Sequence, residues 1–226
     1  MRFSLRRELP ALAIVAAMGA ASAWAWSRVP DRIPVHWGIS GDPDRWGGRA
    51  EGLLVLPAVA LAVWVLLLVV PRFDPGRANY ATFAGAYVTL RVSILGFMAV
   101  MHGVAIAAAL GAPVNMGHIA APVLGILFVV LGGVMGKIRP NWFVGIRTPW
   151  TLSSKRAWTR THRAGGWAFV VLGVATLIAG LASPAAGCGV MLVGSIALVA
   201  FTFVYSWTQW KADPDRTTPG GTTPAP

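Results

Sequence analysis

The sequence predicts an all-α membrane protein with six transmembrane helices and both termini in the cytoplasm. The 226-residue chain is 56% hydrophobic and only 12% charged, with a mean hydropathy of +0.63, which is too apolar for an ordinary soluble domain. Its apolar residues are gathered into six runs of the length needed for membrane-spanning helices. The basic residues lie at the ends of these runs rather than on a polar face, so we interpret them as orientation signals.

The first span, residues 9–26, follows three arginines, which places the N-terminus in the cytoplasm. An A-x-A-like site at 21–23 leaves open a cleaved signal peptide. The apolar run continues past that site through Trp24 and Trp26, which suit a position at the membrane interface. We therefore expect a retained helix, and its cleavage would not change the orientation of the others.

The loop 27–52 contains four arginines balanced by four acidic residues, so we place it outside the cell. Its prolines and glycines indicate turns and a short extended pair of segments. His36, Asp42 and Asp44 are residue types that bind divalent ions. Their irregular spacing argues against a metal site. It favours a structural role, in which the aspartates accept hydrogen bonds from backbone amides of the turns and Arg45 forms an ion pair nearby. We therefore expect no metal site.

The second and third spans are residues 53–70 and 86–110, and the third contains an arginine and a histidine, which are unusual within a membrane. Arg91 lies near its cytoplasmic end, where the side chain can extend to the interface, and the alternative is an internal ion pair. His102 lies toward the outer leaflet, where we expect a polar contact with another helix. We expect no acidic residue within any of the six spans.

The fourth span, residues 118–135, ends in a GxxxG pattern at Gly132 and Gly136, which allows close helix packing. Two further spans, residues 166–182 and 185–207, follow a long polar loop. We expect one membrane domain, residues 1–210. A Thr-, Pro- and Gly-rich tail at 211–226 should be disordered in the cytoplasm.

The polar loop at 137–164 lies in the cytoplasm because it is strongly basic and contains no acidic residue. Its basic residues are Lys137, Arg139, Arg147, Lys155, Arg156, Arg160 and Arg163. Ser153 precedes the run 154–163, which lacks Gly and Pro and so predicts an N-capped helix. One face of this helix should form a shaped surface, made by Ser154, Trp158, His162 and Gly165.

Both long loops resemble parts of a known family. The outer string VPDRIPVHWGISGDPDRWGGR is similar to a short domain of unknown function that opens many bacterial membrane proteins of the SdpI family. The cytoplasmic loop resembles the SdpI signature at Asn141, Phe143, Gly145, Ile146, Arg147, Thr148, Pro149, Trp150, Thr151, Leu152, Ser153, Trp158, Thr161 and His162. With the helix layout, the resemblance covers nearly the whole chain apart from the tail. One departure is that Lys155 and Arg156 stand where family members often have acidic residues.

The resemblance implies a multi-pass protein of the bacterial cytoplasmic membrane that gives immunity to a secreted toxic peptide. It also implies signalling through a transcriptional repressor held at the membrane. We place one candidate binding site in the outer loop, at His36, Trp37, Asp42, Asp44, Arg45 and Trp46. We place a second in the cytoplasmic loop, at Asn141, Phe143, Arg147, Thr148, Pro149, Trp150, Trp158 and His162.

Other functions are weighed against this one. The sequence contains no nucleophile elbow, P-loop, dinucleotide fingerprint or pair of catalytic carboxylates, so we expect neither an enzyme nor a cofactor. Membrane lipids are expected partners, whereas direct binding of nucleic acid is not. The alternative is a small transporter or channel with a midplane site. Each half has three spans with its long loop after the first, and the sequence leaves open whether the halves form an inverted repeat.

Overall fold

The protein, described here by a computed structural model of residues 5–219, is built from six long helices. These helices are α1 (Leu5–Trp26), α2 (Arg49–Phe73), α3 (Ala84–Ala109), α4 (Met116–Met135), α6 (Lys155–Ala182) and α7 (Pro184–Lys211). Each is long and apolar enough to cross a membrane. The predicted all-α membrane fold class is therefore confirmed.

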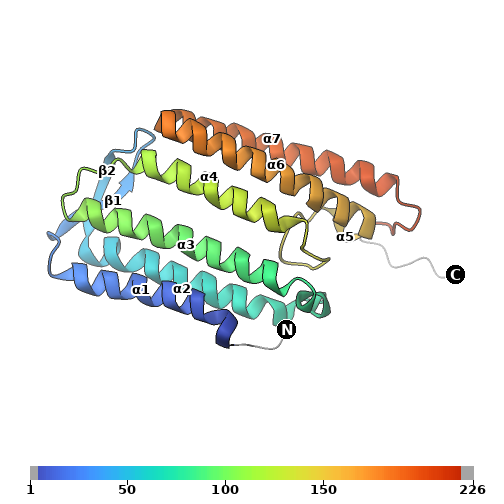
Figure 1. The fold of residues 1–226 in the computed structure, drawn as a ribbon, viewed down its shortest axis with the longest axis horizontal. Coiled ribbons are helices and arrows are strands. Elements are labelled where there is room, and N and C mark those ends of the chain that lie inside the picture. Colours follow the sequence, from blue (N-terminus) through green and yellow to red (C-terminus); the bar gives the residue numbers. More distant parts are fainter. Residues whose placement is uncertain (1–4, 220–226) are drawn as a thin grey trace.

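The helices form two groups of three that lie side by side (Figure 1). In the first group α1, α2 and α3 contact one another, and in the second α6 packs against both α4 and α7. The two groups meet where α3 contacts α4. In each group the long connection follows the first helix, which is compatible with an inverted repeat but does not test it.

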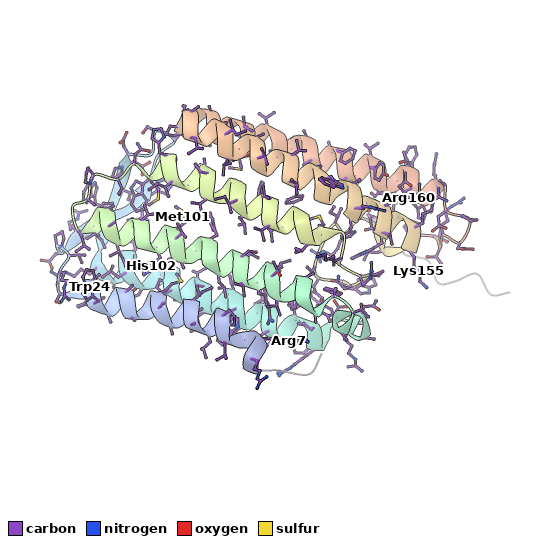
Figure 2. All side chains as sticks on the ribbon, in the orientation of Figure 1. Arg7, Trp24, Met101, His102, Lys155 and Arg160 are labelled. Atoms are coloured by element: carbon purple, nitrogen blue, oxygen red, sulfur yellow. The ribbon has the colours of Figure 1, made fainter. Side chains whose placement is uncertain are left out.

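The connections gather at opposite ends of the bundle. At one end the strands β1 (Arg32–Trp37) and β2 (Pro43–Gly48) form an antiparallel hairpin, the extended pair that the sequence predicts. At the other end lie the short helices η1 (Arg77–Ala81) and α5 (Pro149–Leu152), the start of α1 and the end of α7. Figure 2 shows His102 toward the hairpin end and Lys155 at the opposite end.

The basic loop is shorter than the sequence predicts. The helix expected at 154–163 and the span expected at 166–182 are one continuous helix, α6, of 28 residues. It begins at a Ser154 cap, whose hydroxyl oxygen accepts a hydrogen bond from the Ala157 N–H at 2.9 Å. The face that carries Trp158 and His162 is buried, so it is part of the core and not the predicted surface. The outer loop is also shorter, because α2 already begins at Arg49.

The contact between α4 and α6 is made by glycines spaced seven residues apart. A Cβ atom added to Gly173 on α6 would lie 2.5 Å from the Gly125 carbonyl oxygen on α4. One added to Gly132 would lie 2.5 Å from the Gly166 oxygen. Without side chains the two backbones approach closely, as is common between membrane helices. Gly136 of the predicted GxxxG pattern is not in such a contact, since its nearest neighbour would be 3.8 Å away.

The tail is ordered further than the sequence predicts, at least to Thr217. The Thr217 N–H donates to the Ser153 carbonyl oxygen at 3.0 Å. Ser154 also donates a hydrogen bond to Asp213, which lowers the pKa of that carboxyl group. The predicted disorder of 211–226 is therefore wrong for this first part, because its polar groups bond the start of α6. Residues 220–226 lie outside the described residues.

The glycine contact generates a stability prediction with an adjacent control. In Gly132→Ala the added methyl group meets the backbone of α6, and we expect the free energy of unfolding to fall by about 1–3 kcal/mol. Gly133→Ala adds the same methyl group where nothing lies within 4 Å. We expect it to leave stability unchanged or raise it by up to about 1 kcal/mol, since alanine favours helix. Thermal unfolding in detergent compares the variants, and equal melting temperatures would contradict the proposed contact.

The predicted orientation can be tested with single cysteines in a Cys188→Ser background. Ser40 in the hairpin tip and Thr159 on α6 are both exposed. Because basic residues stay in the cytoplasm, we expect Ser40→Cys to react with an impermeant thiol reagent in intact cells and Thr159→Cys to react only after lysis. The opposite labelling pattern would reverse the topology.

Candidate functional site

The hairpin exposes most of the residues assigned to the outer candidate site. His36 Nδ1 lies 2.6 Å from an Asp44 carboxylate oxygen, and both side chains are at least half exposed. Arg45 pairs with Glu51, six residues further along the chain, at 2.6 Å. Trp46 is 50% exposed. Exposed ion pairs contribute little stability, so these side chains can contact a partner at small cost.

The hairpin tip is fixed to the second group of helices. The Met116 N–H donates to the Gly41 carbonyl oxygen at 3.0 Å, and the Asn115 amide donates to the Ser40 oxygen at 2.9 Å. Gly41 has a φ of +85°, and a side chain there would collide with Asn115. Asp42 participates through its backbone, accepting from the Gly38 N–H at 3.0 Å. Within the described residues, no three His, Cys, Asp or Glu side chains are grouped as metal ligands would be.

His102 makes the predicted polar contact with another helix. Its Nε2 lies 2.9 Å from the hydroxyl of Ser22 on α1. The same hydroxyl lies 2.6 Å from the Leu53 carbonyl oxygen at the start of α2. Both side chains are buried, so this contact joins three helices at the end of the bundle that carries the hairpin.

Arg91 is in a buried ion pair and does not extend to the interface, which corrects the leading prediction for it. Its Nη2 lies 2.8 Å from a carboxylate oxygen of Glu8 on α1, with both side chains at most 4% exposed. Trp64 donates to the other Glu8 oxygen at 3.3 Å, and the guanidinium lies 5.0 Å from the centre of the Tyr87 ring. An acidic residue therefore lies within the first helix, contrary to the sequence-based expectation, because that helix begins before Glu8.

In the cytoplasmic loop, Asn141 organises the backbone of a turn. Its Oδ1 accepts from the N–H groups of Phe143 and Val144 at 3.0 and 2.7 Å. Its Nδ2 donates to the carbonyl oxygens of Arg139 and Val144 at 2.9 and 3.0 Å. Its hydrogen-bonding groups are thus engaged within the loop. These hydrogen bonds give Asn141 a structural role in the loop, and its predicted binding role stays a prediction.

The short loop between α2 and α3 contacts this turn through two residues that the sequence analysis did not single out. The Asp74 carboxylate accepts from the Trp142 N–H at 3.1 Å and from the Tyr80 hydroxyl at 2.7 Å. Burial and the bond to Asp74 raise the pKa of Tyr80, so its hydroxyl keeps the proton that it donates. The only sequence signal was a single acidic residue in an otherwise basic region.

The side chains of His162 and Trp158 also stabilise the loop from inside the protein. The Ile146 N–H donates to His162 Nε2 at 3.0 Å, so the ring proton is on Nδ1, which donates to the Trp158 carbonyl oxygen at 2.8 Å. The two rings stack 4.1 Å apart. A side chain at Gly145, whose φ is +110°, would collide with His162. Both His162 nitrogens are therefore used inside the protein.

The segment Thr148–Pro149–Trp150 forms the start of α5 and attaches it to α7. Thr148 and Thr151 form a reciprocal capping box, with Pro149 in the first turn. The Thr148 hydroxyl donates to Ser206 on α7 at 3.0 Å. Trp150 packs edge-on against Phe203, with ring centres 4.6 Å apart. These contacts position the loop against the last helix.

Of the predicted cytoplasmic site, Phe143, Arg147 and Pro149 are exposed, and Pro149 has no polar side-chain group to offer a partner. Phe143 is 45% exposed. Arg147 donates to the Trp142 carbonyl oxygen at 2.6 Å, and it is otherwise exposed. Trp142, which the sequence analysis did not assign to the site, is 54% exposed beside them. We define Trp142, Phe143 and Arg147 as the cytoplasmic patch.

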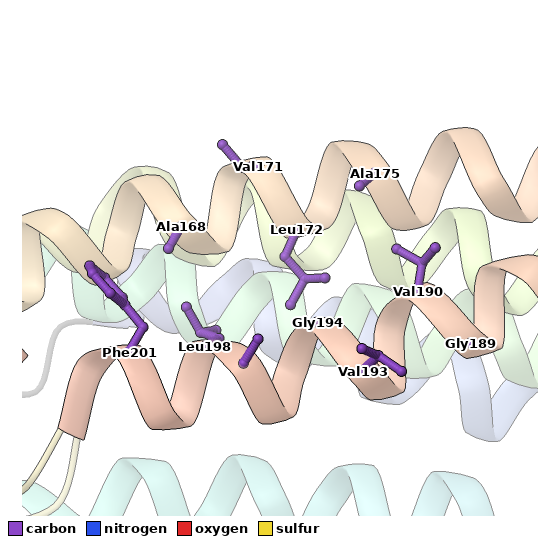
Figure 3. A pocket seen from close by; sticks show the side chains of 11 residues that line it. Ala168, Val171, Leu172, Ala175, Gly189, Val190, Val193, Gly194, Leu198 and Phe201 are labelled. Atoms are coloured by element: carbon purple, nitrogen blue, oxygen red, sulfur yellow. The ribbon is translucent and has the colours of Figure 1, made fainter. Parts of the chain in front are cut away.

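Two hollows lie near the second group of helices. A groove of about 830 Å³ between α6 and α7 is lined only by apolar residues such as Leu172, Val190 and Phe201 (Figure 3). It suits a lipid chain and offers no group for chemistry. A polar cavity of about 950 Å³ at the end of the bundle opposite the hairpin is lined by Lys155 and Arg156, among others. The tail partly balances their charge through Asp213 and Asp215.

Comparisons with known proteins find matches in the two regions that contain the sequence motifs. The model of the SdpI/YfhL protein family matches residues 137–206, and that of a domain of unknown function, DUF1648, matches residues 13–61. Immunity protein SdpI of Bacillus subtilis (strain 168) is 22% identical over 170 residues, which are 75% of this chain and 79% of that protein. An uncharacterized protein of Archaeoglobus fulgidus is 40% identical over 47 residues, 21% of this chain and 25% of that protein. No solved structure matches.

The two family models fall on the two regions that contain the long loops of the structure. Their order along the chain is also that of the predicted motifs. The resemblance predicted from the two motifs is therefore confirmed: residues 137–206 match the SdpI/YfhL protein family, and residues 13–61 on their N-terminal side match DUF1648.

Proposed function

We propose that this multi-pass membrane protein is an immunity protein of the SdpI type, which protects its own cell against a secreted toxic peptide. The observation that carries the proposal is the alignment with an immunity protein over 75% of the chain. The same kinship supports a location in the bacterial cytoplasmic membrane. The hairpin then faces the medium and the basic loop faces the cytoplasm.

The exposed side of the hairpin supports a contact with a peptide outside the cell. It combines Trp46 with the His36–Asp44 and Arg45–Glu51 pairs. Aromatic side chains and arginine are the residue types that contribute most to protein interfaces. The hairpin tip is hydrogen-bonded to α4, which holds the surface in place. Binding of a partner therefore costs little conformational entropy in the hairpin.

The cytoplasmic patch supports a second contact, with a regulator such as a transcriptional repressor. Trp142 and Phe143 expose apolar area beside the Arg147 guanidinium. A DNA-binding regulator has a basic surface for DNA, which the basic loop repels. Contact therefore requires an acidic or apolar surface on another side of that regulator.

A small transporter or channel is the alternative function. A buried ion pair within a membrane is typical of transport pathways, and Glu8–Arg91 is such a pair. Here the Glu8 carboxylate is bonded by both Arg91 and Trp64. The groove between α6 and α7 is apolar along its length. These features favour a structural ion pair, so immunity is the better supported function.

The outer contact can be tested with two tryptophans of similar exposure. Trp46 in the hairpin is 50% exposed and Trp24 at the end of α1 is 52% exposed. We expect Trp46→Ala to reduce survival of a sensitive strain challenged with the candidate peptide toxin by at least about tenfold, as loss of a central interface residue would. Trp24→Ala should protect as the wild type does. Membrane abundance of each variant is the control, and equal protection would remove Trp46 from the contact.

The cytoplasmic patch can be tested with two conservative substitutions. The Arg147 fork bonds a backbone carbonyl oxygen and can bind a partner or a lipid phosphate with its remaining donors, a geometry that lysine cannot reproduce. We expect Arg147→Lys to insert normally but to lose protection or signalling, whereas Arg139→Lys is silent. Labelling topology, membrane abundance and survival are compared. If both variants behave like the wild type, Arg147 serves only to orient the chain.

A further inference from the structure

A small cavity lies between the hairpin and the outer ends of α2 and α3. Its volume is about 250 Å³. An apolar cavity of about 150 Å³ holds a benzene-sized molecule, so this one accommodates a substituted aromatic ring. Its walls are mainly apolar and are formed by Pro34, Val35, Val55, Leu56 and Ala105, with four polar residues: Trp37, Arg45, Glu51 and His102.

The hydrogen bonds of Ser22 fix the protonation state of His102. The Ser22 hydroxyl has one proton and lies 2.6 Å from the Leu53 carbonyl oxygen and 3.0 Å from that of Met18, so the hydroxyl donates to a carbonyl oxygen. The oxygen of Ser22 must then accept from His102 Nε2, at 2.9 Å. His102 therefore carries a proton on Nε2. A second ring proton would place a charge in a buried site without a counter-ion, so the ring is neutral and its Nδ1 is a hydrogen-bond acceptor.

Nδ1 of His102 has no hydrogen-bond partner among the described residues, although the side chain is only 1% exposed. Trp37 Nε1, a donor, is likewise buried without a partner. Both residues line the cavity. Buried polar groups are normally bonded, and an unbonded one calls for an explanation. The cavity thus offers one free acceptor and one free donor on apolar walls.

The charges at the cavity indicate a neutral ligand. Arg45 and Glu51 pair with each other at 2.6 Å, so together they present no net charge. His102 is also uncharged, because its ring carries a single proton, on Nε2. A charged group would lose its hydration on entry without gaining a counter-ion. A hydroxyl group, by contrast, donates one hydrogen bond and accepts another through the same oxygen.

We propose that this cavity binds a small neutral alcohol or phenol. Its hydroxyl donates to His102 Nδ1 and accepts from Trp37 Nε1, and its apolar body fills the space among Val35, Val55 and Leu56. The proposal rests on the cavity alone and does not depend on the immunity function. The same geometry takes either a free molecule or a tyrosine side chain of a peptide.

The test uses the purified full-length protein in lipid nanodiscs, with nitrogen-15 in its histidines, and three probes of similar size. p-Cresol can donate and accept, 4-methylanisole can only accept, and toluene can do neither. We expect p-cresol to shift the His102 Nδ1 resonance and to raise the melting temperature. 4-Methylanisole loses one buried hydrogen bond and should bind about tenfold more weakly, and toluene, which loses both, should bind more weakly still.

Variants assign the effect to the cavity and separate it from partitioning into lipid. His102→Leu and Trp37→Phe each remove one of the two hydrogen bonds, so each should reduce the preference for p-cresol over toluene. His118→Leu, at the exposed start of α4, should retain it. If His102→Leu does not fold, Trp37→Phe still tests the donor. The proposal would be overturned if the wild-type protein bound p-cresol and toluene equally, or if p-cresol did not shift the Nδ1 resonance. The cavity would then hold only water.

A tyrosine-containing tripeptide and its phenylalanine counterpart distinguish the two sources of the hydroxyl. Competition with p-cresol by the tyrosine peptide alone extends the site to peptides. Competition by neither peptide restricts it to free small molecules, and both results retain the hydroxyl site. Competition by both peptides equally would show that no hydroxyl is recognised, which overturns the proposal.

Discussion

The cytoplasmic loop depends on one constraint, which is that an irregular backbone next to a membrane must have its polar groups bonded by the protein. Asn141 and Asp74 bond the backbone at 142–144, and His162 bonds the backbone at Ile146. The loop is thereby held by elements from both groups of helices. Its exposed residues, such as Arg147, are positioned by this buried framework.

The fold class and the hairpin could be predicted from the sequence because they depend on local patterns. Apolar runs identify the spans, and prolines and glycines identify the turns. The ends of the spans were less predictable, because a helix continues past the apolar run where its polar residues find partners. Glu8 shows this, since the ion pair with Arg91, 83 residues away, keeps a charged residue within α1.

The positions of the motif residues were also predictable, but their roles were not. Trp158 and His162 share a helix face, as their spacing indicates, yet that face is buried against the carbonyl oxygen of Ile138 and the backbone near Gly145. Spacing along a helix gives no information about which distant loop covers it. The partners Asp74 and Tyr80 come from another loop for the same reason.

Two buried polar contacts hold α1 against α3, and they lie at opposite ends of the bundle. Ser22 bonds His102 near the hairpin, and Glu8 bonds Arg91 nearer the cytoplasmic end. Breaking either leaves a polar group unbonded in an apolar environment, which is costly for the charged pair in particular. The interface therefore favours one arrangement of the two helices. A ligand that bonds His102 from the cavity side stabilises that arrangement without disturbing Ser22, because it uses the other ring nitrogen.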